Sequence, residues 1–269
     1  MEWFEAVLLG LLQGLTEFLP VSSSGHLEIG KALLGVETSD DLMFTTVVHA
    51  ATVLSTIVVF HKQIWGLLKG FFEFKYNDQT DYLLKIAVSM VPIFIVGVFF
   101  KDAVEGLFGS VHVVGFALLA TAVLLFFSDF ASRPGRASIF PPNNCRNGIS
   151  YWQALAVGLG QAFAVIPGLS RSGTTISTGL ICGVRRDVMA QFSFLMVLVP
   201  ILGEAFLEVI GGEFSSSTVG ALPLCLGFLS AFLSGLFACK VMIAIVKKAR
   251  LSWFALYCLV VAAAIFIFG

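Results

Sequence analysis

Six long apolar segments constrain this chain more than any other feature of its sequence. They run over residues 43–61, 82–100, 112–130, 188–210, 222–246 and 252–268. A helix needs about 20 consecutive apolar residues to cross a bilayer core about 30 Å thick. Hydrophobic residues make up 58% of the chain and charged residues 12%, against roughly one-half and one-quarter in soluble domains. The sequence therefore predicts an all-α, polytopic membrane protein with about six full transmembrane spans.

Two further apolar regions, 3–34 and 151–183, are each interrupted near the middle. The interruptions read PVSSSGH at 20–26 and PGLSRSGTT at 167–175. Each flanking arm has only about 10–15 residues, which is too short for a full crossing. We therefore expect two re-entrant helical hairpins, each of which enters and leaves the membrane by the same face.

The distribution of basic residues supports this topology. With both hairpins re-entrant, twelve Lys and Arg residues fall on one side, and only Lys31 and Lys101 fall on the other. The twelve are Lys62, Lys69, Lys75, Lys85, Arg133, Arg136, Arg146, Arg185, Arg186, Lys247, Lys248 and Arg250. The positive-inside rule then makes the basic side cytoplasmic. On that side, residues 62–81 mix lysine with aromatic residues, which is typical of an interfacial segment.

The two interrupted regions match each other at a constant shift of 148 residues. The matched pairs are Gly10 with Gly158, Gln13 with Gln161, Ser22 with Ser170, Ser24 with Ser172, Gly25 with Gly173, Gly35 with Gly183, Val36 with Val184, and Phe44 with Phe192. Because three spans separate the hairpins, the repeats are expected to be inverted. The sequence thus predicts one integral membrane domain over 1–269, with inverted repeats at about 1–130 and 149–269. The hairpin tips should meet near mid-membrane, where inverted-repeat transporters build polar sites.

The polar residues of the first hairpin are Gln13, Glu17, Ser22, Ser23, Ser24 and His26. Gln13 and Glu17 stand four residues apart, on one helical face. A carboxylate inside a membrane is costly and usually functional, although Glu17 also has a structural alternative, a hydrogen bond to the neighbouring loop. Gln13 is a site residue or a packing residue, and His26 is a site residue or a helix cap.

The polar residues of the second hairpin are Ser170, Arg171, Ser172, Gly173, Thr174 and Thr175. An arginine at this depth needs an anion, and its planar guanidinium suits phosphate oxygens. The alternative is an internal ion pair with Glu17. Small and hydroxyl residues at a helix N-terminus leave backbone N–H groups free, so this hairpin is also a candidate anion cradle.

Other polar residues carry weaker functional expectations. We expect interhelical hydrogen bonds or snorkelling for His49, Asp129, Glu204, Glu208 and Lys240. The five cysteines form no CxxC pair and are expected to act as small hydrophobic residues. The net charge of −1 carries no information about a nucleic-acid partner, and none is expected. The sequence leaves open whether the chain forms a homo-oligomer.

A carboxylate, hydroxyls, an imidazole and an arginine at converging helix ends suit phosphoryl chemistry. The same groups suit binding of an anionic lipid headgroup without turnover, or transport of an anion. Because inverted repeats with broken helices are a transporter architecture, a flippase of a polyprenyl phosphate lipid is the main alternative. Residue spacing alone leaves these functions open.

The stretches QGLTEFLPVSSSGHL (13–27) and PGLSRSGTT (167–175) resemble the two signature regions of the bacterial undecaprenyl-diphosphatase family, also known for bacitracin resistance. The first family pattern is Glu or Gln, three residues, then Glu, and Gln13 with Glu17 fits its Gln version. The second is Pro-Gly-x-Ser-Arg-Ser-x-x-Thr, which residues 167–175 fit throughout. The resemblance extends over nearly the whole chain.

This resemblance implies an integral enzyme of the bacterial inner membrane that hydrolyses undecaprenyl diphosphate to undecaprenyl phosphate and inorganic phosphate. It implies a site that opens towards the periplasm and a divalent cation, Mg²⁺ or Ca²⁺. Glu17 would hold the metal or act as a base, and Arg171 would clamp the diphosphate. Because Gln13 replaces an acid found in other members, Glu17 must carry more of the metal binding. Ser23 and His26 are both candidate nucleophiles, and we favour Ser23 with His26 assisting.

Overall fold

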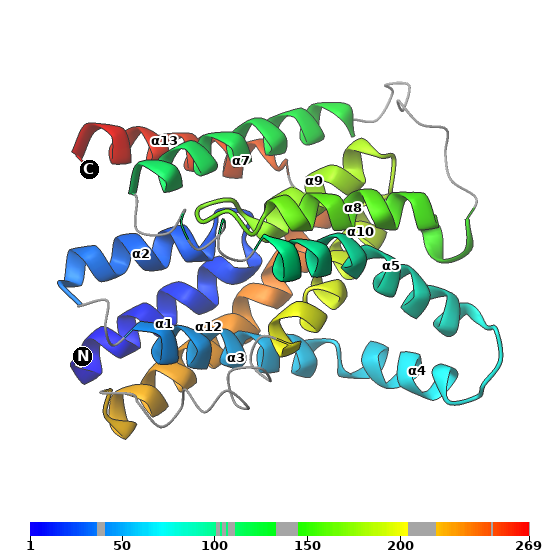
Figure 1. The fold of residues 1–269 in the computed structure, drawn as a ribbon, viewed down its shortest axis with the longest axis horizontal. Coiled ribbons are helices and arrows are strands. Elements are labelled where there is room, and N and C mark those ends of the chain that lie inside the picture. The colour runs from blue at the N-terminus through cyan, green and yellow to red at the C-terminus, as the bar shows by residue number, and fades with distance from the viewer. Residues whose placement is uncertain are drawn as a thin grey trace.

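The computed structural model describes residues 1–36, 41–100, 103, 106, 111–132, 145–203, 219–248 and 250–268, and its regular elements there are all helical (Figure 1). The first half contains α1 (Trp3–Phe18), α2 (Ser23–Leu34), α3 (Asp41–Val59), α4 (His61–Phe71), α5 (Asp78–Phe99) and α7 (Val111–Ala131). The second half contains η2 (Arg146–Gly148), α8 (Tyr151–Phe163), α9 (Arg171–Ile181), α10 (Arg186–Met196), α12 (Ala221–Lys248) and α13 (Ser252–Phe268). The predicted all-α, polytopic membrane fold is confirmed.

Four described helical stretches are long and apolar enough to cross a membrane: Asp78–Phe99, His112–Ala131, Arg186–Gly203 and Ala221–Val246. They coincide with four of the predicted spans. The segment predicted at 43–61 is α3, which bends by 76° into the short helix α4. The segment predicted at 252–268 is α13, a shorter apolar helix of 17 residues. The number of full spans, six, stays a prediction.

Both interrupted regions fold into helical hairpins, with α2 running back along α1 and α9 running back along α8 (Figure 1). In the first hairpin, Gly30 faces Leu9 and Leu12. In the second, Gly160 faces Thr174 and Thr178. The two hairpins point into the centre of the molecule from opposite ends (Figure 1). Their tips can therefore supply one site from both halves of the chain.

Serine caps start the second helix of each hairpin. The Ser22 hydroxyl accepts a hydrogen bond from the Gly25 amide, and the Ser170 hydroxyl accepts one from the Gly173 amide. Such a cap satisfies one of the N–H groups that a helix start leaves free. Since Ser22 and Ser170 are a matched pair of the predicted repeat, the two hairpins restart their helices by the same local chemistry.

The first arm of each hairpin packs on a long helix from the other half of the chain: α1 on α12, and α8 on α5. Gly10 permits the first contact, because an added Cβ would collide with the carbonyl of Gly227. Gly158 permits the second, because an added Cβ would collide with the carbonyl of Ser89. Gly10 and Gly158 are also a matched pair, so these contacts are what a duplicated unit would produce. The repeat boundaries stay a prediction.

Some predictions fall outside the described residues. These concern Lys101, Arg133, Arg136, Glu204 and Glu208. The interhelical role expected for Asp129 is confirmed, since its carboxylate accepts hydrogen bonds from Arg186 at 2.7 Å and from the Leu251 amide at 3.3 Å.

Candidate active site

The tips of the two hairpins touch at the centre of the molecule. The Ser172 hydroxyl at the start of α9 donates a hydrogen bond of 3.0 Å to the carbonyl of Leu19, in the turn between α1 and α2. Gly25 lies against Gly168, where an added Cβ would sit 3.4 Å from the Gly168 Cα. The predicted meeting of the tips is therefore present in the structure.

The end of α1 places Glu17 beside the start of α2. Leu19 precedes Pro20 and is extended, as residues before proline usually are, so α1 stops there. Ser22 has a positive φ of 70°, an uncommon conformation outside glycine, and caps α2. This tight turn makes Ser23 the first residue of α2 and directs its hydroxyl back to α1.

Three side chains converge on one oxygen of Glu17. Its Oε2 accepts hydrogen bonds from Gln13 Nε2 at 2.9 Å and from Ser23 Oγ at 2.6 Å. His49 Nε2 of α3 lies 3.8 Å from the same oxygen. A hydroxyl that donates to a carboxylate at this distance has a base in place for its own deprotonation. Glu17 is thus the base that the structure presents to Ser23.

His26 has different partners from the one expected. Its Nδ1 donates to the Ser22 carbonyl at 2.8 Å, and its Nε2 lies 2.7 Å from the Tyr257 hydroxyl of α13. Its ring stacks on that of Tyr257, with centroids 5.5 Å apart. Because both ring nitrogens are engaged elsewhere, the structure does not bring His26 to the Ser23 hydroxyl. The hydrogen bond to the Ser22 carbonyl and the contact with Tyr257 of α13 account for the position of His26.

Arg171 lies in a cavity between the hairpins. The cavity is lined by Glu17, Phe18, Thr52, Val53, Thr56, Gln161, Arg171, Ser172, Thr175, Ser193, Phe194, Val197, Leu198 and Ile201. The cavity has a volume of about 20 Å³, which is enough for one water molecule and too little for a diphosphate. Substrate entry therefore requires its walls to separate.

The guanidinium of Arg171 makes no direct ion pair with a carboxylate among the described residues. Nη1 is buried and has no hydrogen-bond partner within the described part of the chain. Nor does an ion pair within 4.0 Å join Arg171 to Glu17, although both line the cavity. Arg171 as a residue is half-buried, and a cation there without a direct counter-ion favours an anionic ligand. Glu17 lies near enough to attract Arg171 electrostatically, so the alternative of an internal pair is present only as this longer-range attraction and not as a contact within 4.0 Å.

The remaining residues predicted on the second hairpin divide into two groups. Ser170 caps α9, and the Thr175 hydroxyl donates to the Arg171 carbonyl at 2.9 Å and lies 2.6 Å from the Ser193 hydroxyl. These contacts shape the turn. In contrast, the Thr174 hydroxyl is buried without a partner in the described structure. Gly173 keeps α9 close to the other tip, because an added Cβ would sit 3.3 Å from Pro20.

On the first hairpin, Ser22 and Ser24 lie with their hydroxyls 3.4 Å apart. Ser22 is buried by its capping role, whereas Ser24 is half-buried. Neither lines the cavity. Ser23 does not line it either, but its hydroxyl is hydrogen-bonded to Glu17, which does.

Sequence reasoning missed several polar residues of the site. We expect an interhelical hydrogen bond or snorkelling for His49, and its Nε2 does make an interhelical approach, but to Glu17 at the site, while its Nδ1 bonds the Thr45 carbonyl of its own helix at 2.8 Å. The others line the cavity and are Thr52, Thr56, Gln161 and Ser193. The available signals were the helical spacing of His49, Thr52 and Thr56 on one face of an apolar segment, and the match of Gln161 with Gln13.

The residues around Glu17 fit a hard divalent cation. Mg²⁺ and Ca²⁺ prefer oxygen ligands, and Mg²⁺ often binds through one or two carboxylates plus substrate phosphates. Besides the Glu17 carboxylate, Gln13 Oε1 is buried without a partner in the described structure. The described residues contain no cluster of three or more His, Cys, Asp or Glu suited to a metal. Such an ion would therefore depend on substrate oxygens for part of its coordination.

Comparison with known proteins shows which family this chain belongs to. The family model for bacitracin resistance protein BacA matches residues 6–264. A relative from Bacteroides fragilis named undecaprenyl-diphosphatase is 54% identical over 265 residues, which cover 97% of this chain and 96% of the relative. Relatives of the same name from Parabacteroides distasonis and Christiangramia forsetii are 54% and 48% identical and cover 95% and 99% of their own lengths, with 96% and 100% of this chain. The chain that builds the Glu17–Ser23 pair and the Arg171 cavity therefore belongs to the BacA family.

Proposed function

We propose that this protein is a membrane phosphatase that hydrolyses undecaprenyl diphosphate to undecaprenyl phosphate and inorganic phosphate. This reaction recycles the lipid carrier used in cell-wall synthesis. Relatives at 48–54% identity carry the name undecaprenyl-diphosphatase over nearly their full length. The observation that carries the proposal is the Ser23 hydroxyl held 2.6 Å from Glu17, beside a cavity lined by Arg171, whose Nη1 has no hydrogen-bond partner among the described residues.

Ser23 is the nucleophile of this proposal. Its Oγ attacks the terminal phosphorus while Glu17 accepts the hydroxyl proton. The bond from that phosphorus to the bridging oxygen breaks, and undecaprenyl phosphate leaves with the bridging oxygen. Water then attacks the phosphoserine, Glu17 returns its proton to the Ser23 oxygen, and both water protons leave with inorganic phosphate.

Arg171 and the start of α9 stabilise the transferring phosphoryl group. The guanidinium faces three oxygens that gain charge in the transition state, and the helix N-terminus adds partial positive charge. Thr174, whose hydroxyl has no partner among the described residues, and Gly173 lie in the first turn of α9 and are proposed as further members of this cradle. A direct attack by His26 is the competing pathway, and it requires His26 to release Tyr257.

A bound Mg²⁺ or Ca²⁺ would supply further positive charge to the phosphate oxygens. Glu17 and the free Oε1 of Gln13 are the protein groups proposed to hold it. Glu17 would then serve both as a ligand of the ion and as the base for Ser23. One acidic residue would therefore suffice in this chain, where Gln13 stands in place of a second acidic residue.

We also propose that the site faces the periplasm of a bacterial inner membrane. The first hairpin opens at the end of the molecule opposite α4, which carries Lys62 and Lys69, and the positive-inside rule assigns basic ends to the cytoplasm. The prenyl chain then stays in the bilayer while only the diphosphate reaches the hairpin tips. A flippase accounts for the hairpins equally well, but it needs no hydroxyl–carboxylate pair.

The test compares turnover with binding in the purified protein. Wild type should release phosphate from undecaprenyl diphosphate, and Ser23→Ala should lower the rate by about 10³-fold or more while lipid binding persists. Ser234→Ala is a matched control, because that hydroxyl of α12 donates within its own helix. Ser23→Ala with wild-type turnover would exclude Ser23 as nucleophile, and binding without turnover in wild type would favour the flippase.

A further inference from the structure

Helix α4 carries two exposed lysines on one side, away from the hairpin tips. Lys62 and Lys69 stand seven residues apart, so two helical turns place them on the same side of α4, about 10 Å apart along its axis. Gly66 lies between them and is also exposed, and an added Cβ there would meet no atom within 4 Å. The three residues form a basic strip whose long side chains can close on one group placed over Gly66.

An apolar strip runs beside the basic strip on the exposed side of α4. Trp65 is 71% exposed, Leu68 43% and Phe72 65%, and they follow one another at helical spacing. Ile64 and Leu67, on the other side of the helix, pack against the core. Because α4 also bends by 76° away from α3, it suits a helix at the membrane surface, with its apolar strip towards acyl chains and its lysines at headgroup depth.

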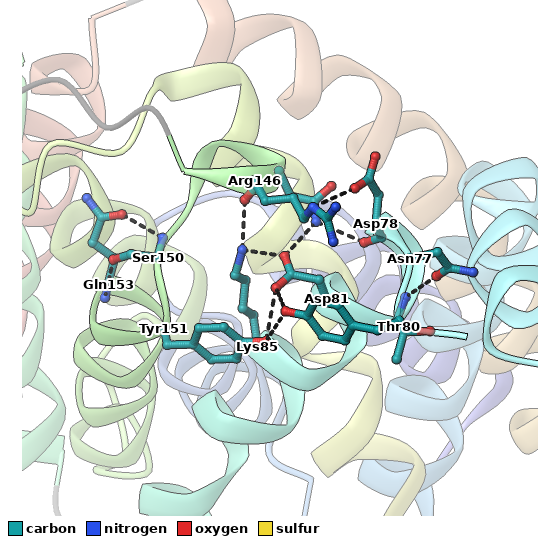
Figure 2. A network of polar contacts seen from close by, with 11 residues as sticks. Asn77, Asp78, Thr80, Asp81, Lys85, Arg146, Ser150, Tyr151 and Gln153 are labelled. Atoms are coloured by element: carbon teal, nitrogen blue, oxygen red, sulfur yellow. Dashed lines mark hydrogen bonds and ion pairs between the residues drawn. The ribbon is translucent and has the colours of Figure 1, made fainter. Parts of the chain in front are cut away.

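Polar contacts fix the orientation of α4 on the rest of the protein. The Gly70 carbonyl near its end accepts a hydrogen bond of 2.8 Å from Asn77 Nδ2, at the start of α5. The start of α5 is held in turn by Asp81, whose carboxylate accepts hydrogen bonds from Lys85 and, at 2.9 Å, from Tyr151 of α8 (Figure 2). The basic strip therefore faces outward before any partner binds.

Ion pairs divide the basic residues of the predicted cytoplasmic side into two groups. Four of them each pair with a carboxylate: Lys85 with Asp81, Arg146 with Asp78, Arg185 with Asp187, and Arg186 with Asp129. In contrast, Lys62 and Lys69 make no ion pair within 4.0 Å in the described part of the chain. The charge of these two lysines is therefore available to an anion from outside the chain.

The two strips together identify the class of that anion. A phosphate group matches the basic strip, and acyl chains match the apolar strip beside it. A soluble anion would use only the first strip and a neutral lipid only the second, whereas an anionic phospholipid uses both. Basic residues next to a membrane surface attract such lipids. We propose that α4 binds an anionic phospholipid, with the lipid phosphate between Lys62 and Lys69 and above Gly66.

The experiment uses native mass spectrometry of the full-length protein in a non-ionic detergent. It measures retention of phosphatidylglycerol, with phosphatidylcholine of the same acyl chains and free glycerol phosphate in parallel. Wild type should retain phosphatidylglycerol in preference to both. Lys62→Gln and Lys69→Gln should each weaken its retention about fivefold, the contribution of one lysine near a membrane surface. Arg185→Gln is the matched control, because it removes the same charge from a residue that Asp187 already pairs, and it should leave retention unchanged.

A second pair of variants tests the position between the lysines. Gly66→Glu places a carboxylate at helical spacing from both lysines and should abolish the preference for phosphatidylglycerol, whereas Gly66→Gln should keep it. The fold should accept both side chains, because a Cβ at Gly66 meets no atom within 4 Å. Thermal unfolding and phosphate release should match wild type in all variants.

Three results would overturn the proposal. These are equal retention of phosphatidylcholine, lysine variants that behave like Arg185→Gln, and a Gly66→Glu protein that behaves like Gly66→Gln. Retention of glycerol phosphate as strong as that of phosphatidylglycerol would also overturn it, because a soluble anion would then be the partner.

Discussion

At the residue scale, Glu17 and Arg171 differ in how far the protein itself satisfies their charged side chains. Glu17 is satisfied by Gln13 and Ser23, whereas Arg171 Nη1 has no partner in the described structure. Functional sites often keep such unfavourable groups because a ligand satisfies them. The structure therefore predicts that the two residues respond differently to substitution.

Arg171→Met should lower phosphate release by about 10³-fold or more, since an arginine that stabilises a transferring phosphoryl group contributes that much. The unfolding temperature of the ligand-free protein should stay equal or rise, because the substitution removes a half-buried charge that makes no direct ion pair. Activity assays and thermal unfolding in one detergent would measure both. Arg171→Lys, which keeps the charge without the planar fork, should retain intermediate activity. A marked fall in unfolding temperature for Arg171→Met would show that Arg171 has a structural role instead.

The sequence predicted the residues of the two tips better than their partners. Glu17, Ser23 and Arg171 were identifiable because polar residues inside apolar helices are rare. The approach of His49 to Glu17 depends on how α3 packs beside α1, which no local pattern encodes. His26 was assigned to Ser23 from spacing alone, and the contact with Tyr257, 231 residues later in the chain, could not be foreseen.

At the element scale, close contacts between halves hold the hairpins in place. Helix α1 meets α12 at Gly10, and α8 meets α5 at Gly158. In membranes, small residues stabilise such contacts because they let helix backbones approach. The sequence revealed the glycine pair through the repeat, but it did not reveal that each arm packs on a helix of the opposite half.

Gly10→Ala and Gly158→Ala should each lower the free energy of unfolding by about 1–3 kcal/mol, because the new methyl group meets a backbone carbonyl that cannot move alone. Gly97→Ala on α5 is the matched control, since its Cβ would meet no atom within 4 Å. That control should be neutral or stabilising by up to about 1 kcal/mol. Chemical unfolding in detergent would compare the three. Equal stability of Gly10→Ala and Gly97→Ala would contradict the close packing of α1 on α12.

At the scale of the whole molecule, the two hairpins open at opposite ends (Figure 1). Their tips meet at the centre, where the Ser172 hydroxyl bonds the Leu19 carbonyl. The proposed orientation assigns the end with Cys145 to the cytoplasm and the open end of the first hairpin to the periplasm. Composition predicted the all-α membrane fold, because it follows from the bilayer as a solvent, and the orientation read from charge stays a prediction. The exact span boundaries followed less well, as the bend between α3 and α4 is set by packing rather than by hydropathy.

Cysteine labelling would test the orientation. In a variant whose only cysteine is Cys145, which is exposed, an impermeant maleimide should label inverted vesicles but not spheroplasts. Leu33→Cys in a cysteine-free background should behave in the opposite way, because Leu33 is 82% exposed near the open end of the first hairpin. Labelling of Cys145 in intact spheroplasts would contradict the proposed orientation.

The most direct test of the central claim is phosphate release from undecaprenyl diphosphate by purified protein, with one substitution in each hairpin. Glu17→Gln and Arg171→Ala should each abolish release, because one site is built from both tips, and the Glu17→Gln protein should still bind the lipid. Release by wild type should also stop with EDTA and return with Mg²⁺ or Ca²⁺. Undiminished release by either variant, with the protein folded, would contradict a single phosphatase site between the hairpins.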